Sequence, residues 1–234
     1  MIMAHLKRYM MPAFWPASVK EEKFIVRPSC GPHPISRCLP LQIVVKNVLG
    51  LVESTTEARQ IIRAGKIKVD GKVRKNPKFP VGLMDIIEIP DISKHYRVDV
   101  NRKGIIVNPI KASEAAHKLC MITSKTTLKG GRTQLNLHDG RNIVLTKQGE
   151  KYSVRDSLLI TVPGNSISKH FKLQKGSPGT IFLGKNIGIS GKIKEVKTRE
   201  SMTEKSTIII TSEKKDIETL KDYMLAGEPG GSGK

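Results

Sequence analysis

The chain is 234 residues long and carries 41 Lys and Arg against 21 Asp and Glu, a formal net charge of +20 with a pI near 10.0. A compact protein with this charge repels itself unless a polyanion neutralises it, so we expect a nucleic-acid partner. No apolar run approaches the roughly 20 residues of a membrane span. Aromatic residues make up only 4% of the chain, too few to bind single strands by stacking their bases. This favours a folded RNA that is held by its backbone.

Residues 1–40 contain many prolines and little periodicity, which predicts an extended, non-globular basic arm. The large apolar residues Phe14, Trp15 and Phe24 are rarely kept in a purely disordered tail, so we expect the arm to order on its partner. Its candidates for contact with RNA are His5, Lys7, Arg8, Arg27, His33 and Arg37.

The chain has three cysteines, an odd number, and the apolar run near its N-terminus fails as a secretory signal because Pro12 and Pro16 break it. Together these observations indicate a reducing compartment. We therefore expect a cytoplasmic protein. Cys30, His33 and Cys38 have a spacing that resembles part of a zinc knuckle. A structural zinc site needs four ligands and no second Cys or His pair follows nearby, so we expect neither a metal nor a cofactor.

Two helices are predicted next, over residues 41–51 and 55–64. The second begins after Ser54, has Glu57 at capping-box spacing and stops at Gly65. Arg59 and Arg63 are four residues apart, so they lie together on one face of this helix.

A basic β-hairpin is predicted over residues 66–75, where apolar and basic residues alternate around the turn Asp70-Gly71. Ile67, Val69 and Val73 are expected to point inward. The outward candidates for contact with RNA phosphates are Arg59, Arg63, Lys66, Lys68, Lys72, Arg74, Lys75 and Lys78. A soluble surface normally mixes the signs of its charges, and this one does not.

Residues 41–92 resemble the S-four RNA-binding domain of ribosomal proteins, some pseudouridine synthases and a tyrosyl-tRNA synthetase appendage. The resemblance rests on residues spread along this stretch, which are Ala58, Arg59, Ile62, Gly65, Ile67, Val69, Asp70, Gly71, Lys72, Pro77, Val81, Asp85, Ile87 and Ile89. It implies binding of RNA without saying which RNA.

Residues 93–172 are predicted to form a central, mostly β domain, with strands over 95–100, 104–108, 133–137, 142–145 and 154–162 and one short helix opening at Ser113. Residues 175–193 are rich in glycine and resemble the KOW motif at Gly176, Gly184, Asn186, Gly188, Gly191 and Ile193. This resemblance implies an SH3-like barrel over residues 173–212. Gly179 and Gly184-Lys185 have the spacing of a nucleotide phosphate loop, but Asn186 follows and no helix does, so we reject a nucleotide site. Residues 213–234 are predicted to hold a short helix, over 216–225, and a flexible tail.

The predicted fold class is thus multidomain α+β, built from the arm, the S-four-like domain, the central β domain and the KOW barrel. This order resembles the small-subunit ribosomal protein family S-four-e of archaea and eukaryotes, and the short form of the chain resembles the archaeal members. Local matches include His5-Leu6-Lys7-Arg8, Asp70-Gly71-Lys72-Val73-Arg74 and Lys118-Leu119-Cys120. The resemblance implies a ribosomal protein that clamps ribosomal RNA beside other ribosomal proteins, with no catalysis and no small-molecule substrate.

Two alternatives stay open from the residues alone. An RNA-modifying enzyme with an S-four domain would need a catalytic aspartate in an Arg-Leu-Asp context, which Asp85, Asp139 and Asp156 lack. A KOW-containing transcription regulator would share the last unit but would not need the arm or the Arg59/Arg63 pair.

Overall fold

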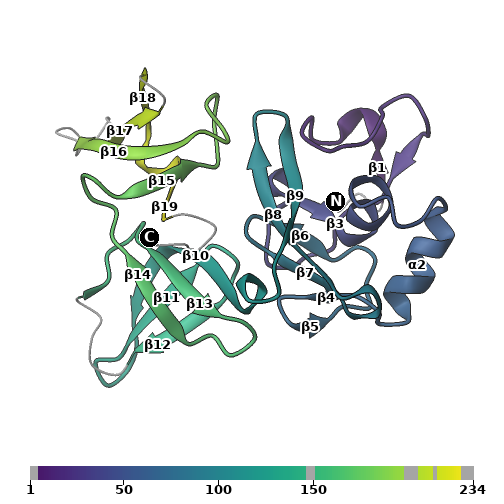
Figure 1. Ribbon diagram of the computed structural model, residues 1–234, viewed down its shortest axis with the longest axis horizontal. Coiled ribbons are helices and arrows are strands. Elements are labelled where there is room, and N and C mark those ends of the chain that lie inside the picture. The colour runs from purple at the N-terminus through teal and green to yellow at the C-terminus, as the bar shows by residue number, and fades with distance from the viewer. Residues whose placement is uncertain (1–4, 146–150, 198–204, 213–214, 228–234) are drawn as a thin grey trace. The chain divides into compact units, whose positions relative to one another are not determined.

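The computed structural model describes residues 5–145, 151–197, 205–212 and 215–227, and the chain divides into two compact units, residues 1–116 and 117–234 (Figure 1). No helix in these described ranges has the length and apolar character needed to cross a membrane.

The first unit combines short helices with three small sheets. Its elements are β1 (Leu6–Lys7), η1 (Arg8–Met10), β2 (Phe24–Ile25), η2 (Ile35–Arg37), β3 (Cys38–Pro40), α1 (Leu41–Ile43), η3 (Val44–Val48), α2 (Thr55–Arg63), β4 (Lys68–Val69), β5 (Lys72–Val73), β6 (Pro80–Gly82), β7 (Ile86–Ile89), η4 (Pro90–Ile92), β8 (Lys94–Asn101), β9 (Gly104–Ile110) and η5 (Glu114–Ala116). The largest sheet has the strand order β5-β4-β7-β8-β9, and β1 pairs with β2 and β3 with β6.

The first unit extends past the boundary that the sequence predicts at residue 92. β7 pairs antiparallel with β8, with Ile86 opposite Arg97, and β8 then pairs with β9 along its full length. Only a tight turn separates β7 from β8, and it ends at Ser93 with a φ of 50°. The change of pattern near residue 93 therefore coincides with a turn within one sheet, and β8 and β9 continue the sheet that contains β4 and β7.

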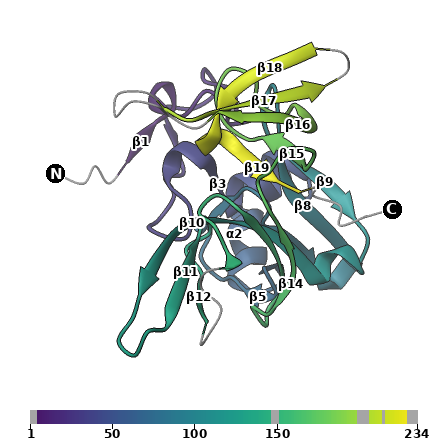
Figure 2. The same ribbon diagram turned by 90° about the vertical axis from the view of Figure 1, so that its left-hand side faces the viewer.

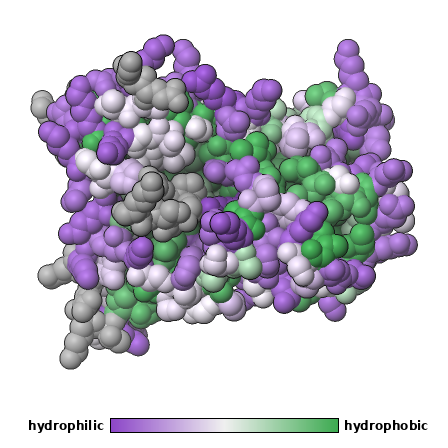
Figure 3. Space-filling model, viewed as in Figure 1, coloured by the Kyte–Doolittle hydropathy of each residue, from purple (hydrophilic) through white to green (hydrophobic). Residues whose placement is uncertain are grey.

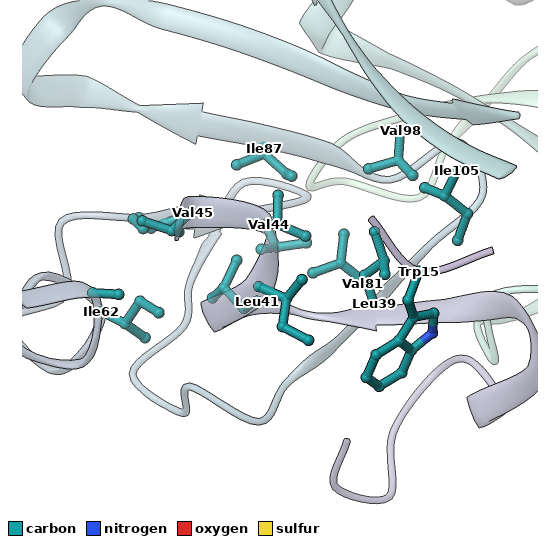
Figure 4. Packing of buried hydrophobic residues seen from close by; sticks show 14 residues of the cluster. Trp15, Leu39, Leu41, Val44, Val45, Ile62, Val81, Ile87, Val98 and Ile105 are labelled. Carbon is teal, nitrogen blue, oxygen red and sulfur yellow. The ribbon is translucent and has the colours of Figure 1, made fainter. Parts of the chain in front are cut away.

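A hydrophobic cluster in this unit draws on segments between Trp15 and Ile105 that are far apart in the sequence (Figure 4). Its buried members are Trp15, Leu39, Leu41, Ile43, Val44, Val45, Ala58, Ile62, Ile67, Val69, Val81, Ile87, Val98 and Ile105. Because the contributing segments are far apart in the sequence, the helices, the sheet and the N-terminal segment are stabilised jointly.

Residues 5–40 are accordingly not the extended, non-globular arm that their prolines predict. Trp15 is only 4% exposed, Leu39 is fully buried, and Leu6 and Ile25 pack against the same cluster. Proline suppresses regular helices and central strands, so this segment has little periodicity to detect, but it does not prevent an irregular segment from burying its apolar side chains.

Both predicted helices are present. Residues 41–48 form the short α1 followed by the π-helical turn η3, and the β-branched residues there are consistent with such an irregular helix. α2 begins as predicted: the Ser54 hydroxyl accepts from the Thr56 amide at 3.2 Å, and Glu57 accepts from the Ser54 amide at 3.4 Å. Ala58 and Ile62 on its inner face are buried, and Gly65 follows with a φ of 79°.

The predicted hairpin is also present, with one error. Asp70 and Gly71 have φ values of 52° and 70°, as a type I′ turn requires, and Ile67 and Val69 are buried. Val73, which we expected to point inward, is exposed because β5 is a two-residue strand at the edge of its sheet. The carboxylate of Asp70 accepts from the Ile86 amide at 3.0 Å and so connects the turn to β7.

The second unit is almost entirely β. Its elements are β10 (His117–Thr127), β11 (Thr133–Leu137), β12 (Asn142–Leu145), β13 (Ser157–Thr161), β14 (Ile167–Phe171), β15 (Pro178–Ile181), β16 (Ser190–Lys197), β17 (Thr207–Ser212), β18 (Lys215–Leu220), η7 (Lys221–Tyr223) and β19 (Met224–Ala226). They form two five-stranded sheets, of order β12-β11-β10-β13-β14 and β18-β17-β16-β15-β19. Figure 2 shows the long twisted hairpin that β10 makes with β11.

The predicted strands of both units are confirmed, but the sequence did not reveal β10 or β14. β10 is the central strand of its sheet, and residues 118–122 are buried in succession. A strand that is buried on both faces, as β10 is over these residues, lacks the alternation of apolar and polar residues by which strands are recognised. The partly exposed β14 is not explained in this way.

The short helix predicted over residues 216–225 is wrong. These residues form β18, the single turn η7 and β19, and β18 pairs with β17 over six residue pairs. Sheet pairing there overrides a weak local preference for helix. The sheet built on the KOW-like residues thus continues to residue 226 instead of ending at 212, and apart from Gly227 the tail predicted to be flexible lies outside the described residues.

Candidate nucleic-acid interface

α2 presents its two arginines outward. Arg59 and Arg63 are both exposed, whereas Ala58 and Ile62 on the opposite side anchor the helix in the core. The Arg59 Nε donates to the side-chain oxygen of Gln42 at 3.2 Å, which fixes the direction of its guanidinium group. At the edge of the molecule where Figure 1 places α2, Figure 3 shows hydrophilic residues beside a hydrophobic patch.

A groove of about 1010 Å³ lies beside α2 in the first unit, and we call it the basic groove. Its lining residues come from the N-terminal segment, α1, η3, α2 and the loop before β6, and they are His5, Arg8, Ala17, Glu21, Glu22, Phe24, Ile25, Val26, Arg27, Gln42, Ile43, Lys46, Asn47, Thr55, Arg59, Arg63, Asn76, Pro77 and Lys78. Six of the predicted RNA contacts therefore line one concave surface, namely His5, Arg8, Arg27, Arg59, Arg63 and Lys78.

The charge of the basic groove is one-sided. Six Lys or Arg residues line it against two acids, Glu21 and Glu22. Both acids pair with Arg8, at 2.9 and 3.6 Å between the charged atoms, so most of the buried charge of Arg8 is compensated within the N-terminal segment. The remaining cations leave a surface that attracts a polyanion.

Sequence reasoning missed several polar residues of the basic groove. Lys46 donates to the Thr55 hydroxyl at 3.2 Å, which joins η3 to the start of α2. Asn76 accepts from the Lys78 amide at 3.0 Å and donates to Ser29 at 3.3 Å, and these bonds position Lys78 at the rim. Lys46 did give a signal, because it is the one charged residue in the predicted helix 41–51.

The basic hairpin does not line the groove. Lys72 and Lys75 are exposed and Lys68 is half-buried, while Lys66 pairs with Asp91 at 2.9 Å. The guanidinium of Arg74 lies 4.3 Å from the ring centroid of Phe79, a cation–π contact that occupies one face of the group. The hairpin thus offers a second, separate basic surface.

The three remaining candidates of the N-terminal segment have different environments. Lys7 and Arg37 are exposed. His33 is buried, with a side chain only 3% exposed, and its Nε2 lies 3.1 Å from a carboxylate oxygen of Asp85. Asp85 also accepts from the Gly82 amide at 2.8 Å, so His33 fastens the N-terminal segment to the turn after β6. We predicted His33 as an RNA contact, and the structure corrects this by enclosing the ring within the fold. The sequence alone does not reveal which histidine is enclosed.

The cysteines near His33 are in unlike surroundings. Cys30 is exposed and Cys38 is buried in β3. Burial, with the negative charge of Asp85 as a smaller contribution, raises the pKa of the Cys38 thiol to about 12, which disfavours the thiolate that a metal would need. Among the residues that the structure describes, no group of three or more His, Cys, Asp or Glu is arranged to hold a metal ion.

The second unit has a basic surface of its own. A groove of about 440 Å³ is lined by Lys151, Lys172 and Lys221, and by one acid, Asp156. Asp156 is buried, and its carboxylate is hydrogen-bonded within the fold. It accepts from the Ser153 and Leu173 amides at 3.0 Å each, and the Nε2 of His170 lies 2.7 Å from one of its oxygens. The three lysines therefore dominate the charge that this groove presents.

The sequence matches three family descriptions in succession: the RS4NT (NUC023) domain over residues 3–36, the S4 domain over residues 39–87 and Ribosomal family S4e over residues 92–167. The small ribosomal subunit protein eS4 of Methanothermobacter thermautotrophicus is 42% identical over 222 residues, which cover 94% of this chain and 90% of that protein. The chain belongs to the eS4 family. This confirms the S-four-e resemblance and its archaeal character, and eS4 proteins are structural ribosomal proteins rather than enzymes.

Other eS4 relatives agree. The protein of the same name from Methanocaldococcus jannaschii is 43% identical over 231 residues, covering 94% of this chain and 92% of the relative. The crystal structure of the 30S ribosomal protein S4e from Thermoplasma acidophilum superimposes with a TM-score of 0.70 at 29% identity, covering 81% of this chain and 94% of that one. The multidomain α+β architecture with an S4 domain is therefore that of the eS4 family.

Proposed function

We propose that this chain is a structural constituent of the small ribosomal subunit, that it acts on the ribosome in the cytoplasm, and that it clamps ribosomal RNA through contacts with phosphates. The observation that carries the proposal is the basic groove, where Arg27, Arg59, Arg63 and Lys78 converge from segments far apart in the sequence. Guanidinium and ammonium groups gathered on a concave surface suit the closely spaced phosphates of a folded RNA backbone.

Clamping follows from the number of separate basic surfaces. The basic groove, the hairpin lysines and the lysine-lined groove of the second unit offer three places at which one RNA fold is held. Surfaces tethered in one chain raise one another's effective concentration, so their joint affinity exceeds that of any single surface. Contacts with phosphates carry no base identity, so the shape of the RNA and neighbouring ribosomal proteins would supply the specificity.

The affinity for ribosomal RNA is expected to fall steeply with salt. If about eight phosphates are neutralised, the logarithm of the association constant should fall with the logarithm of the salt concentration with a slope of roughly −6 to −7. Filter binding or fluorescence anisotropy with small-subunit RNA fragments measures this slope. A slope shallower than about −2 would contradict the proposal, because it would mean that few cations contact phosphate.

Replacing both Arg59 and Arg63 with glutamine is expected to weaken binding to all RNA fragments alike and to reduce the salt slope by about 2, one for each lost phosphate contact. The matched control is Arg102→Gln with Lys103→Gln, which removes the same charge at the exposed turn between β8 and β9, outside the basic groove. Equal losses in the two double variants would show that only net charge matters. A loss confined to one RNA sequence would indicate base recognition instead.

A further inference from the structure

The N-terminal ribbon, formed by β1 and β2, has two unlike faces. Leu6 is opposite Ile25 in the register, and both side chains pack against the core of the first unit. Lys7 is opposite Phe24, and because side chains alternate along a strand these two point the other way. The ribbon is thus anchored on one side and presents an aromatic ring and a cation on the other.

Aromatic rings and cations alternate on this outer face. Phe24 is exposed at 44% and Tyr9, just after β1, at 68%. Lys23 lies 5.6 Å from the centroid of the Phe24 ring, Lys7 lies 5.6 Å from that of Tyr9, and the His5 ring is 5.5 Å from Phe24 at an interplanar angle of 47°. An exposed ring with cations beside it suits a planar, electron-rich group attached to a phosphate.

The ring of Phe24 is also part of the basic groove. Phe24 and His5 line that groove together with Arg27, Arg59 and Arg63. An RNA backbone held by these arginines would pass an exposed ring, and a base without a pairing partner would find there an apolar face to replace its lost stacking.

We propose that Phe24, with His5 and Lys23 beside it, is a stacking site for one unpaired base of the RNA whose backbone lies in the basic groove. This inference rests on the proposed function and adds contact with a base to contacts with phosphates. Stacking on a ring tolerates any base, so the site selects an unpaired nucleotide over a paired one and does not select its identity. One ring is enough for this, although a low aromatic content argues against tracking a long single strand.

The test uses the full chain and two RNA stems of the same sequence, one fully paired and one with a single bulged 2-aminopurine nucleotide. The chain is expected to bind the bulged stem about tenfold more tightly and to quench the 2-aminopurine fluorescence, since stacking on a ring contributes this order of affinity. Phe24→Leu, which keeps an apolar side chain but removes the ring, is expected to abolish both the preference and the quenching. The readout is the ratio of the affinities for the bulged and the paired stem, so a change that lowers both affinities alike does not count as loss of stacking.

Met10→Ala is the matched control, because Met10 is an exposed apolar residue without a ring, in the turn η1 that follows β1. This variant should keep the preference. Emission from Trp15, the only tryptophan of the chain and a buried one, reports whether each variant is folded. A preference that survives in Phe24→Leu, or equal binding of the two stems by the unmodified chain, would overturn the stacking site and leave the phosphate clamp standing. Failure of the unmodified chain to bind either stem at low salt would overturn both proposals.

Discussion

Replacing Trp15 with alanine is expected to destabilise the first unit by about 3–5 kcal/mol, the usual cost of removing a large aromatic side chain from a core. Trp15 is buried against the cluster that includes Leu39, Val81 and Ile105 (Figure 4). The cavity left behind would be lined by side chains of the sheet and of β3, which are fixed by their own backbone pairing and relax little. Urea denaturation followed by circular dichroism measures the loss.

Two comparisons sharpen this prediction. Trp15→Phe should cost less, because it retains an aromatic ring and removes the indole Nε1, which is buried without a hydrogen-bond partner among the described residues. Val19→Ala, at an exposed position of the same segment, should leave the free energy of unfolding almost unchanged. If residues 5–40 were an arm that orders only on RNA, Trp15→Ala would have no effect, and limited proteolysis would cleave this segment of the free protein first.

Replacing Asp139 with asparagine is expected to destabilise the second unit by about 3–5 kcal/mol, because it removes a carboxylate that pairs with a buried cation. The side chain of Lys118 is completely buried in β10, and its Nζ lies 3.0 Å from Asp139. The Nε of Arg141 lies 3.2 Å from the same carboxylate oxygen. Replacing Lys118 with methionine and Asp139 with leucine together should cost less than the single change, since the fully buried cation is removed along with its carboxylate and Arg141, whose side chain is 18% exposed, keeps contact with water.

The same pair makes the second unit sensitive to acid. Burial by itself raises the pKa of Asp139, but the charges of Lys118, His138 and Arg141 and the hydrogen bond from Lys118 outweigh burial and hold this pKa below its ordinary value. A carboxyl group with a lowered pKa stabilises the fold fully above its unfolded value of about 4, and that contribution is lost as the pH falls through the folded value. Asp139→Asn should therefore flatten the acid side of the stability profile. An exposed counterpart, Asp216→Asn in the pair with Lys194, should barely change the melting midpoint.

Much of the first unit was predictable because the signals are local. The hydroxyl of Ser54, the carboxylate of Glu57 and Gly65 define both ends of α2, and Asp70-Gly71 determines the turn of the hairpin, each within a few residues. The positions of Arg59 and Arg63 follow from the same periodicity, so the sequence also predicted the part of the candidate interface that lies on α2.

Contacts between distant segments decided the rest. His33 and Asp85 are 52 residues apart, and only their pairing in the fold removes His33 from the candidate surface. The carboxylates of Glu21 and Glu22 pair with Arg8, and the ring of Phe79 covers one face of the Arg74 guanidinium. Residues with the same formal charge therefore differ in how available that charge is to an RNA phosphate. The sequence by itself determined the family, the net charge and the elements with local start and stop signals. Only the tertiary structure decided which side chains are enclosed and which cations remain exposed to a polyanion. Both depend on packing between distant segments, and the spacing of those segments in the sequence has no periodicity from which contacts could be predicted.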